Sequence, residues 1–167
     1  MTRVLAIDPG NTYSAYALIA ADTRRPLKFG KVLNAELLTI LSSTLNLTQP
    51  QTRVKVEMVA SYGMAVGKEV FETCVWIGRF AHHCEAYVSD VELVYRRDVK
   101  LHFCQSSRAK DANIIQALVD RFASGEPNRG KGTKSAPGWF YGFAADVWQA
   151  YALAVLDADR IDSEVSW

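Results

Sequence analysis

The segment Arg3–Gly10, RVLAIDPG, constrains the fold of this chain more than any other stretch. Its aliphatic and β-branched residues have the length and make-up of a buried strand, and Pro9-Gly10 forces a turn directly after it. Asp8 therefore lies where a central strand ends, and a carboxylate there is costly unless a cation or a donor pairs with it. Two interpretations stand at this point: Asp8 caps the turn, or it binds a divalent cation together with other acidic groups.

The composition is that of an ordinary globular protein, with 167 residues of which 49% are hydrophobic and 22% charged. This length favours a single domain over residues 1–167 with a substantial core. No apolar run approaches the roughly 20 residues of a membrane span, and the N-terminus lacks the basic and apolar regions of a signal peptide. We therefore expect no membrane association and a cytoplasmic location.

The net charge of +1 carries little information, but its distribution along the chain is uneven. Between Arg96 and Lys134, nine basic residues against four acidic ones leave a net charge of +5. From Ala144 to Trp167, five acidic residues against one arginine leave −4. This asymmetry is compatible with a basic groove for a polyanion, although a solvated surface is the default reading of any charged run.

Apolar periodicity predicts an α/β fold with the element order βββαβαβαα, and hence one mixed five-stranded sheet with helices on both faces. The expected strands are Arg3–Asp8, Tyr13–Ala20, Leu27–Leu33, Arg53–Ala60 and Val91–Tyr95. The expected helices are Ala35–Leu47 (ended by Gln49-Pro50), Glu69–Tyr87, Ser107–Ala123 and Phe143–Asp159. Arg97–Phe103 is compatible with either a strand or a short helix.

Three carboxylates occupy informative places in this pattern. Asp8 ends the first strand, and Asp146 lies in the alanine-rich C-terminal helix. Glu57 belongs to a strand in which Val54 and Val56 face the core, so that it falls with Lys55 on the non-core face. Oxygen ligands suit hard divalent cations, and two ions about 4 Å apart stabilise a phosphodiester displacement. Each acid also has an ordinary structural explanation, so spacing alone supports the three-carboxylate site only weakly.

The loop Ser124–Trp139 is basic, rich in glycine and proline, and of a length that is usually functional. Within it, Gly125–Gly132 nearly spells a phosphate-binding Walker loop. Gly132 replaces the Ser or Thr that would hold magnesium, and a helix rather than a strand precedes the loop. We therefore expect no nucleotide there. Contacts from Lys131 and Lys134 to phosphates, or a merely solvated loop, are the two remaining readings.

The order and separation of several motifs resemble the RuvC Holliday junction resolvases over nearly the whole chain. These motifs are IDPG at Ile7–Gly10, VEM at Val56–Met58 and DVWQAYALAV at Asp146–Val155. The phage-encoded branch is the most similar, through SYGMAVGKEVFETCVWIGRF after Glu57 and SSRAKDANIIQALVDRF at Ser106–Phe122. IDPG alone is shared by several ribonuclease H-like families, whereas the ordered set is specific. A phage or prophage origin is the corresponding expectation.

Carried over position by position, the resemblance assigns the catalytic groups. Asp8 matches the first catalytic acid, Glu57 the second, and Asp146 the first acid of a C-terminal pair. Lys100 and Lys110 match two lysines that approach the scissile phosphate. In this reading Lys110 stabilises the charge that develops during the reaction.

One position departs from the family pattern. Cellular members carry an aspartate three residues after the one matched by Asp146, and Gln149 stands there. Residues i and i+3 share a helix face, so Gln149 would still face the metals and could ligate weakly or hold a water. An alternative frame matches Asp146 to the second aspartate and puts Phe143 at the first position. The first frame keeps AYALAV on the alternating alanine pattern of the family.

The resemblance implies a ribonuclease H-like fold, a homodimer, and Mg²⁺- or Mn²⁺-dependent nicking of four-way and other branched DNA junctions. It implies two ions per active site, with Asp8 between them, and products with 5′-phosphate and 3′-hydroxyl ends. The rival interpretations are a branched-DNA-binding protein without catalysis and a ribonuclease H-like RNA-processing nuclease.

Further residues are expected to contact the DNA. Arg108, Lys131 and Lys134 would hold backbone phosphates, which gives affinity without sequence readout. Tyr62 or Met64, in the glycine-punctuated loop after Glu57, could wedge against unstacked bases. Packing in the core is the more ordinary role for these two side chains.

Overall fold

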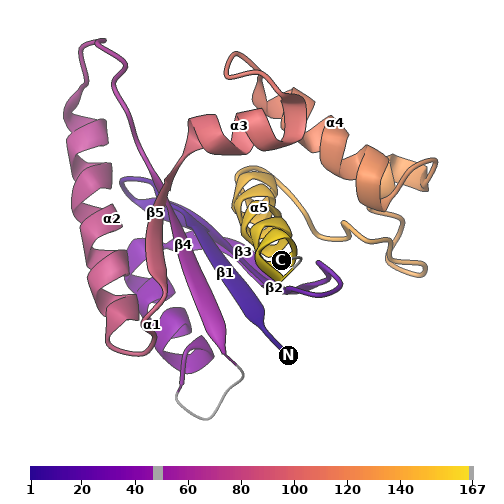
Figure 1. The fold of residues 1–167 in the computed structure, drawn as a ribbon, viewed down its shortest axis with the longest axis horizontal. Coiled ribbons are helices and arrows are strands. Elements are labelled where there is room, and N and C mark those ends of the chain that lie inside the picture. The colour runs from indigo at the N-terminus through magenta and orange to yellow at the C-terminus, as the bar shows by residue number, and fades with distance from the viewer. Residues whose placement is uncertain (47–50, 166–167) are drawn as a thin grey trace.

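The computed structural model describes residues 1–46 and 51–165, which form five strands, five α-helices and one short 3₁₀ helix (Figure 1). The strands are β1 Arg3–Asp8, β2 Tyr13–Ala20, β3 Pro26–Leu33, β4 Thr52–Met58 and β5 Val91–Tyr95. The helices are α1 Asn34–Thr44, α2 Lys68–Glu85, α3 Arg96–Cys104, α4 Asp111–Phe122, η1 Pro127–Gly130 and α5 Val147–Val165. Within this described part of the chain, no helix has the length and apolarity to cross a membrane.

The five strands form one mixed sheet, as the sequence predicted, and their order in the sheet is β3-β2-β1-β4-β5. β1, β2 and β3 are antiparallel neighbours, which follows from the short connections between them. β1, β4 and β5 run parallel to one another. Parallel strands end at the same edge of a sheet, so the residues after β1, β4 and β5 are brought together there.

Helices cover both faces of the sheet, which confirms the predicted layering. On one face, α1 and α2 bury their leucines and aromatic residues against β1, β2 and β4. On the other face, α5 crosses the sheet and is itself covered by α3 and α4, as Figure 1 shows. From Val147 to Ala158 every residue of α5 is buried, because the helix is enclosed on all sides. The alanines of α5 allow this close approach to the strands.

Two predicted helix starts were wrong, and the last helix, expected to end at Asp159, continues to Val165. Residues 97–103, left open between strand and helix, belong to helix α3. The helix expected from Ser107 starts at Asp111, because Lys110 has an extended backbone and its N–H donates to the Asn113 side chain at 2.8 Å. The helix expected from Phe143 starts at Val147, because Ala145 has a left-handed backbone (φ 45°). The expected end of α1 at Leu47 and its terminator Gln49-Pro50 lie outside the described residues.

The basic loop Ser124–Trp139 is a defined substructure. It contains η1 and then a tight hairpin in which Thr133 and Ala136 exchange backbone hydrogen bonds and Gly132 pairs with Pro137. Glycine is required at position 138, where a Cβ would lie 2.3 Å from the carbonyl oxygen of Gly130. The Walker-like segment thus leads into a hairpin and not into the helix N-terminus that a phosphate loop needs.

The prediction that Lys55 and Glu57 lie on a non-core face of β4 was wrong. Val54 and Val56 face α1 and α2, but the opposite face is covered by α5. The Lys55 side chain is only 1% exposed and its Nζ lies 2.7 Å from Asp90, 3.0 Å from Glu92 and 3.5 Å from the fully buried Asp157 of α5. Charges can be buried on this face because they are paired.

Arg53 completes this buried network. Its guanidinium donates to both carboxylate oxygens of Asp157, at 2.8 and 3.0 Å, and lies 3.1 Å from Asp90. Two cations from β4 therefore hold one carboxylate of α5. The network fixes α5 along the strand that carries Glu57.

We expect Lys55→Met to destabilise the protein by about 3 kcal/mol, because it leaves the buried Asp157 with one of its two cations removed. Urea denaturation measures this free energy of unfolding. Arg160→Ala is the matched control, since the 3.5 Å pair of Arg160 with Glu92 is solvent-exposed and should contribute about 0.5 kcal/mol or less. Equal effects of the two substitutions would contradict the structural role of the network.

Candidate active site

Asp8 and Glu57 lie side by side at the ends of two parallel central strands. The β1–β4 register pairs Ile7 with Val56, so the next residue on each strand is one of the two acids. Neighbouring strands are about 4.8 Å apart. Asp8 and Glu57 share a face with Ala6 and Val94, which pack toward α5. Two carboxylates are thus held close together on a largely buried face.

Asp146 supplies a third acidic group at the same edge. It directly precedes α5, and its carbonyl oxygen accepts the N–H groups of Gln149 and Ala150 at 3.0 and 3.1 Å. Its side chain forms an ion pair with Lys31 of β3. The negative charge of Asp146 reaches both Asp8 and Glu57, and contributes to raising the pKa of each. The structure therefore gathers the three acids that the sequence singled out.

Arg96 is the residue that the sequence reasoning missed. It follows β5 at the start of α3, and its Nη1 donates to Glu57 at 3.0 Å while its Nη2 donates to Asp111 at 2.5 Å. A signal for it existed, since β5 was predicted and its end falls at the same sheet edge as Asp8 and Glu57. The role of Lys31 was missed as well: β3 is antiparallel to β2 and so runs in the same direction as β1, which brings Lys31 to the edge where Asp8 lies.

The negative charges around Asp8 and Glu57 outweigh the positive charge of Arg96. Burial, then the charge of Glu57, raises the pKa of Asp8 to about 8, although Arg96 opposes the shift. Burial also raises the pKa of Glu57, again against the effect of Arg96. The nearby Asp111 adds to both shifts. One arginine does not neutralise this group of acids, so the site favours either bound protons or an additional cation.

The donor set fits a hard divalent cation in its chemistry, since all three acids offer oxygen ligands. In the described residues, however, no three His, Cys, Asp or Glu side chains lie close enough together to hold one ion. Arg96 and Lys31 instead engage Glu57 and Asp146. These two cations occupy carboxylate oxygens that a metal would need. If Arg96 and Lys31 moved away, the oxygens of Glu57 and Asp146 would be free to bind a metal.

Gln149 provides a second observation in favour of a cation. It is 4% exposed, and its Oε1 has no hydrogen-bond partner among the described residues. A buried acceptor without a donor costs about 1–3 kcal/mol. The alternative sequence frame, with Phe143 at the first position, gains nothing from the structure, because Phe143 is buried among aromatic rings that include Phe140 and Trp148.

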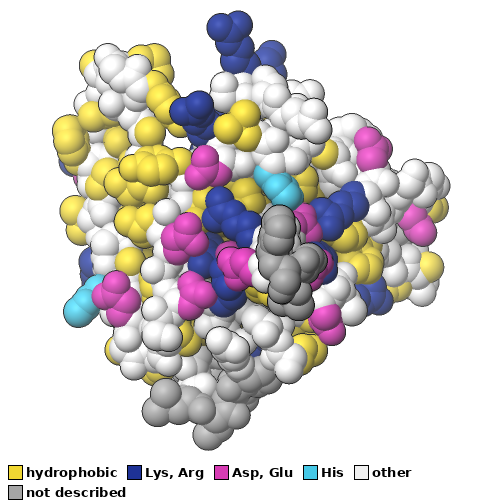
Figure 2. Space-filling model, viewed as in Figure 1, with side chains coloured by type: hydrophobic (Ala, Val, Ile, Leu, Met, Phe, Trp, Pro, Cys, Tyr) yellow, Lys and Arg dark blue, Asp and Glu magenta, His cyan; other side chains and the backbone are white. Residues whose placement is uncertain are grey.

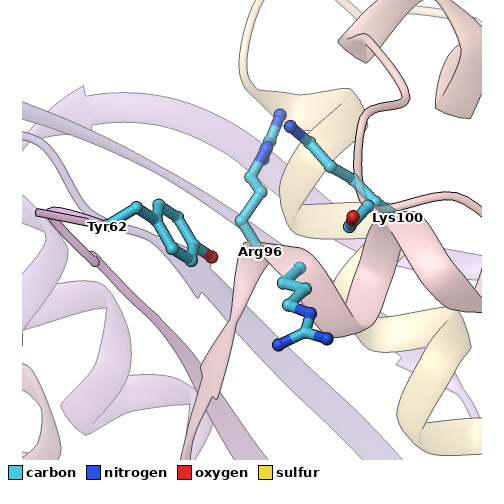
Figure 3. Close-up of a pocket in the computed structure, with 5 residues that line it drawn as sticks. Tyr62, Arg96 and Lys100 are labelled. Carbon is cyan, nitrogen blue, oxygen red and sulfur yellow. The ribbon is translucent and has the colours of Figure 1, made fainter.

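A pocket of about 340 Å³ adjoins the acids. Tyr62, Arg96, Arg97, Lys100 and Ser107 line it, and Figure 3 shows Tyr62 reaching from the segment after β4 toward the start of α3, which carries Arg96 and Lys100. Two arginines and a lysine around one hollow suit an anionic ligand such as a phosphate.

The other residues that the sequence proposed for DNA are distributed around this region. Lys110 precedes Asp111, which is bonded to Arg96, so the start of α4 lies beside the site. Tyr62 and Met64 are 67% and 72% exposed, so the alternative that they pack in the core is wrong. Arg108 is exposed before α4. Lys134 is exposed at the hairpin tip and Lys131 is half-buried at its base, and within residues 1–46 and 51–165 neither forms an ion pair with the acids.

The raised pKa of Asp8 predicts a pH-dependent stability. A group that binds its proton more tightly in the folded state stabilises the fold below its unfolded pKa, and this contribution is lost as pH rises through the folded pKa. We therefore expect stability to fall between about pH 4 and pH 8. Asp8→Asn should remove this part of the decline, so that the variant is more stable than the parent protein at pH 8. Urea midpoints at pH 5 and pH 8 test this; identical pH profiles would contradict it.

Gln149→Asp tests whether this position faces a metal. Without divalent ions the new carboxylate is buried beside other acids, so the melting temperature should fall by several degrees. Added Mg²⁺ or Mn²⁺ should raise it by more than in the parent protein. Gln149→Leu is the control, which removes the unpaired oxygen and should be stable and less responsive to metal. A metal response of Gln149→Asp equal to that of the parent would place the side chain away from the ion.

Comparison with solved structures gives the relatives of this fold. No protein-family model and no curated protein sequence matches the chain. The structure of RuvC from Thermus thermophilus is 19% identical with a TM-score of 0.65, and covers 97% of this chain and 96% of its own. T. thermophilus RuvC in complex with a Holliday junction substrate is 17% identical with a TM-score of 0.70, over 98% and 97%. The fowlpox virus Holliday junction resolvase is 13% identical with a TM-score of 0.53, over 95% and 99%. The chain therefore has the ribonuclease H-like fold that the sequence motifs led us to expect.

Proposed function

We propose that this protein is a metal-dependent, structure-selective DNA endonuclease that nicks four-way and other branched junctions. The observation that carries the proposal is the buried, incompletely neutralised pair of Asp8 and Glu57, with the half-exposed Asp146 at the same edge of the sheet. The fold is shared with T. thermophilus RuvC and the fowlpox virus resolvase, both of which have been solved on Holliday junction DNA. The same three acids are those that the motif resemblance assigns to catalysis.

The residues have distinct parts in the proposed chemistry. Asp8, Glu57 and Asp146, with the amide oxygen of Gln149, would hold Mg²⁺ or Mn²⁺, two ions in all. When bound, the metal supplies an activated water and neutralises charge on the phosphate. Asp8, at the end of the central strand β1, would be a ligand together with the other two acids. Hydrolysis by this route leaves 5′-phosphate and 3′-hydroxyl ends.

Basic side chains would hold the phosphate in place. Lys110 directly precedes α4 and Lys100 lies midway along α3; both would contact the scissile phosphate. Arg96 would pass from Glu57 to the phosphate, since its guanidinium already lies between the carboxylates and the basic pocket. Fixed cations around the reacting group act in the low dielectric of a half-buried site, where they are more effective than in water.

The DNA arms would be held through their backbones. Arg108, Lys131 and Lys134 would contact phosphates, which gives affinity without reading sequence. Junction selectivity must then come from shape. Tyr62 and Met64, exposed on the loop after Glu57, would insert against unstacked bases at the junction centre.

We propose a homodimer, in which an exposed apolar patch contacts its copy. Phe71 and Val75 of α2 are exposed, and Leu93 and Tyr95 project from the same face of β5; these four are between 44% and 62% exposed. Figure 2 shows hydrophobic side chains gathered over the α2 side of the molecule. A two-fold dimer presents two sites to a substrate of two-fold symmetry.

The nuclease activity is tested with labelled four-way, three-way and linear DNA in Mg²⁺ or Mn²⁺. Asp8→Asn and Glu57→Gln should each lower nicking about 100-fold or more, while junction binding in Ca²⁺ stays largely intact. Asp22→Asn makes the same chemical change in the exposed turn between β2 and β3 and should leave nicking unchanged.

The two rival functions give different results in the same assay. A non-catalytic binder would retard the junction in a gel without any metal-dependent nick. An RNA-processing nuclease would cut RNA duplexes in preference to DNA junctions. Undiminished cleavage by Asp8→Asn would overturn the assignment of the metal site.

A single domain over residues 1–167, a cytoplasmic location and a phage or prophage origin stay predictions from the sequence.

The dimer is tested by sedimentation of a Phe71→Glu, Val75→Glu double variant. Two charges in an apolar contact should convert the dimer to a monomer, with the fold retained because both side chains are exposed. His82→Glu adds a charge at the far, exposed end of α2 and serves as the control. A parent protein that sediments as a monomer at micromolar concentration would contradict the proposal.

A further inference from the structure

A second pocket, of about 530 Å³, lies between β3 and the segment that leads into α5. It is lined by aromatic rings together with one guanidinium and one carboxylate: Arg25, Phe29, Phe122, Glu126, Trp139 and Tyr141, with Pro26, Pro137 and Gly138 completing the wall. None of these residues takes part in the chemistry proposed above. The pocket therefore has a composition that the nuclease site does not explain.

The aromatic wall is rigid. Trp139 stacks on Phe122 with ring centroids 5.2 Å apart and an interplanar angle of 8°. Its indole Nε1 donates to the Tyr151 hydroxyl at 3.0 Å, and that hydroxyl donates to the carbonyl of Arg24 at 2.9 Å. The Arg25 guanidinium lies 4.9 Å from the centre of the Trp139 ring. A fixed indole and a planar cation thus border one space, in which little side-chain freedom has to be lost on binding.

The chemistry of the lining selects for a flat heteroaromatic ligand. Aromatic faces and a guanidinium plane stack on nucleobases of any sequence. The Glu126 carboxylate can accept a hydrogen bond from an exocyclic amine, whereas it would repel a phosphate. Tyr141 is 43% exposed, so it can close over a ring that enters. A purely aliphatic ligand would form no hydrogen bond with Glu126 and no stacking contact with the Arg25 guanidinium.

The pocket is connected to the nuclease site through two parts of the chain. Phe29 precedes Lys31, the ion-pair partner of Asp146, by two residues on β3, a distance of about 7 Å. The Phe29 ring also lies 4.6 Å from that of Phe143, just ahead of Asp146. Arg25 is six residues from Lys31, about 20 Å along the strand. With a rise of about 3.4 Å per nucleotide, the pocket is roughly two to six base steps from the acids.

We infer that this pocket binds an unpaired nucleobase of the DNA strand that is held at the nuclease site. The inference rests on the proposed function, because it takes the polyanion at the acids to be DNA. Pro137 and Gly138 of the basic hairpin form part of the wall, so Lys131 and Lys134 can hold phosphates next to the base that enters. The pocket would thereby favour branched DNA, in which bases near the crossover are free to unstack.

Nuclear magnetic resonance on the full-length protein tests the inference without any cleavage. The chain has four tryptophans, and Trp139→Phe identifies the indole N–H signal of Trp139. The ¹⁵N-labelled protein is titrated, in the absence of divalent metal, with a single-stranded DNA hexamer and with an abasic hexamer of equal length. The intact hexamer should shift the Trp139 signal and the abasic one should not.

Substitutions at the rim separate stacking from charge. Tyr141→Ala and Arg25→Ala should each weaken binding of the intact hexamer about tenfold. Arg25→Lys keeps the positive charge but lacks the planar guanidinium group. It should therefore retain only part of the affinity that Arg25→Ala loses. Lys28→Ala removes a cation from the same strand outside the pocket and is the matched control. Affinity for the abasic hexamer should be the same for Tyr141→Ala and the parent protein.

The outcomes distinguish the pocket from the nuclease. Equal shifts with intact and abasic DNA, or equal effects of Arg25→Ala and Lys28→Ala, would overturn base binding, and a protein occupant would then explain the pocket. If the protein nicks junctions but fails this test, the proposed function stands and the inference fails. If it passes this test but cuts no junction, the pocket stands as a single-strand site and the nuclease proposal fails.

Discussion

The structure depends on the burial of two adjacent carboxylates at the ends of parallel strands. Asp8 and Glu57 are placed by the β1–β4 register on a face that α5 covers. Like charges in that position repel each other, and burial weakens the solvation of both. Two cations partly offset this repulsion: Arg96, which directly follows β5, pairs with Glu57, and Lys31 of β3 pairs with Asp146.

Other buried acids in the same protein are neutralised more completely, which distinguishes this group from a structural ion-pair network. Asp157 is held by Arg53 and Lys55. Burial disfavours the charge of Asp159, yet hydrogen bonds from Arg121, His102 and Arg24 hold its pKa below the usual range. At Asp8 the shift has the opposite sign. A fold that balances its other buried charges leaves this one open to an external cation, as a site for metal and phosphate requires.

Much of the fold was predictable from local pattern, and the failures have identifiable causes. Alternation and turn residues located β2 and β5 to the residue, because strand period and turn chemistry are local. The starts of α4 and α5 were misplaced, because they depend on a side-chain cap at Asn113 and on a left-handed residue, Ala145. The buried face of β4 was misjudged, since charged residues look solvent-facing until their partners on α5 are known.

The sequence by itself predicted that Asp8, Glu57 and Asp146 belong to one site, because the motifs that carry them resemble a known family in their order and separation, whereas spacing alone supported this only weakly. Only the tertiary structure decided what surrounds them. Arg96, at the start of α3, and Lys31, on β3, reach the acids from other parts of the chain, and the Gln149 oxygen has no hydrogen-bond partner among the described residues. The aromatic pocket likewise forms only where β3 meets the segment before α5. Local pattern specifies which groups a strand end carries, whereas long-range packing sets their charge balance and neighbours.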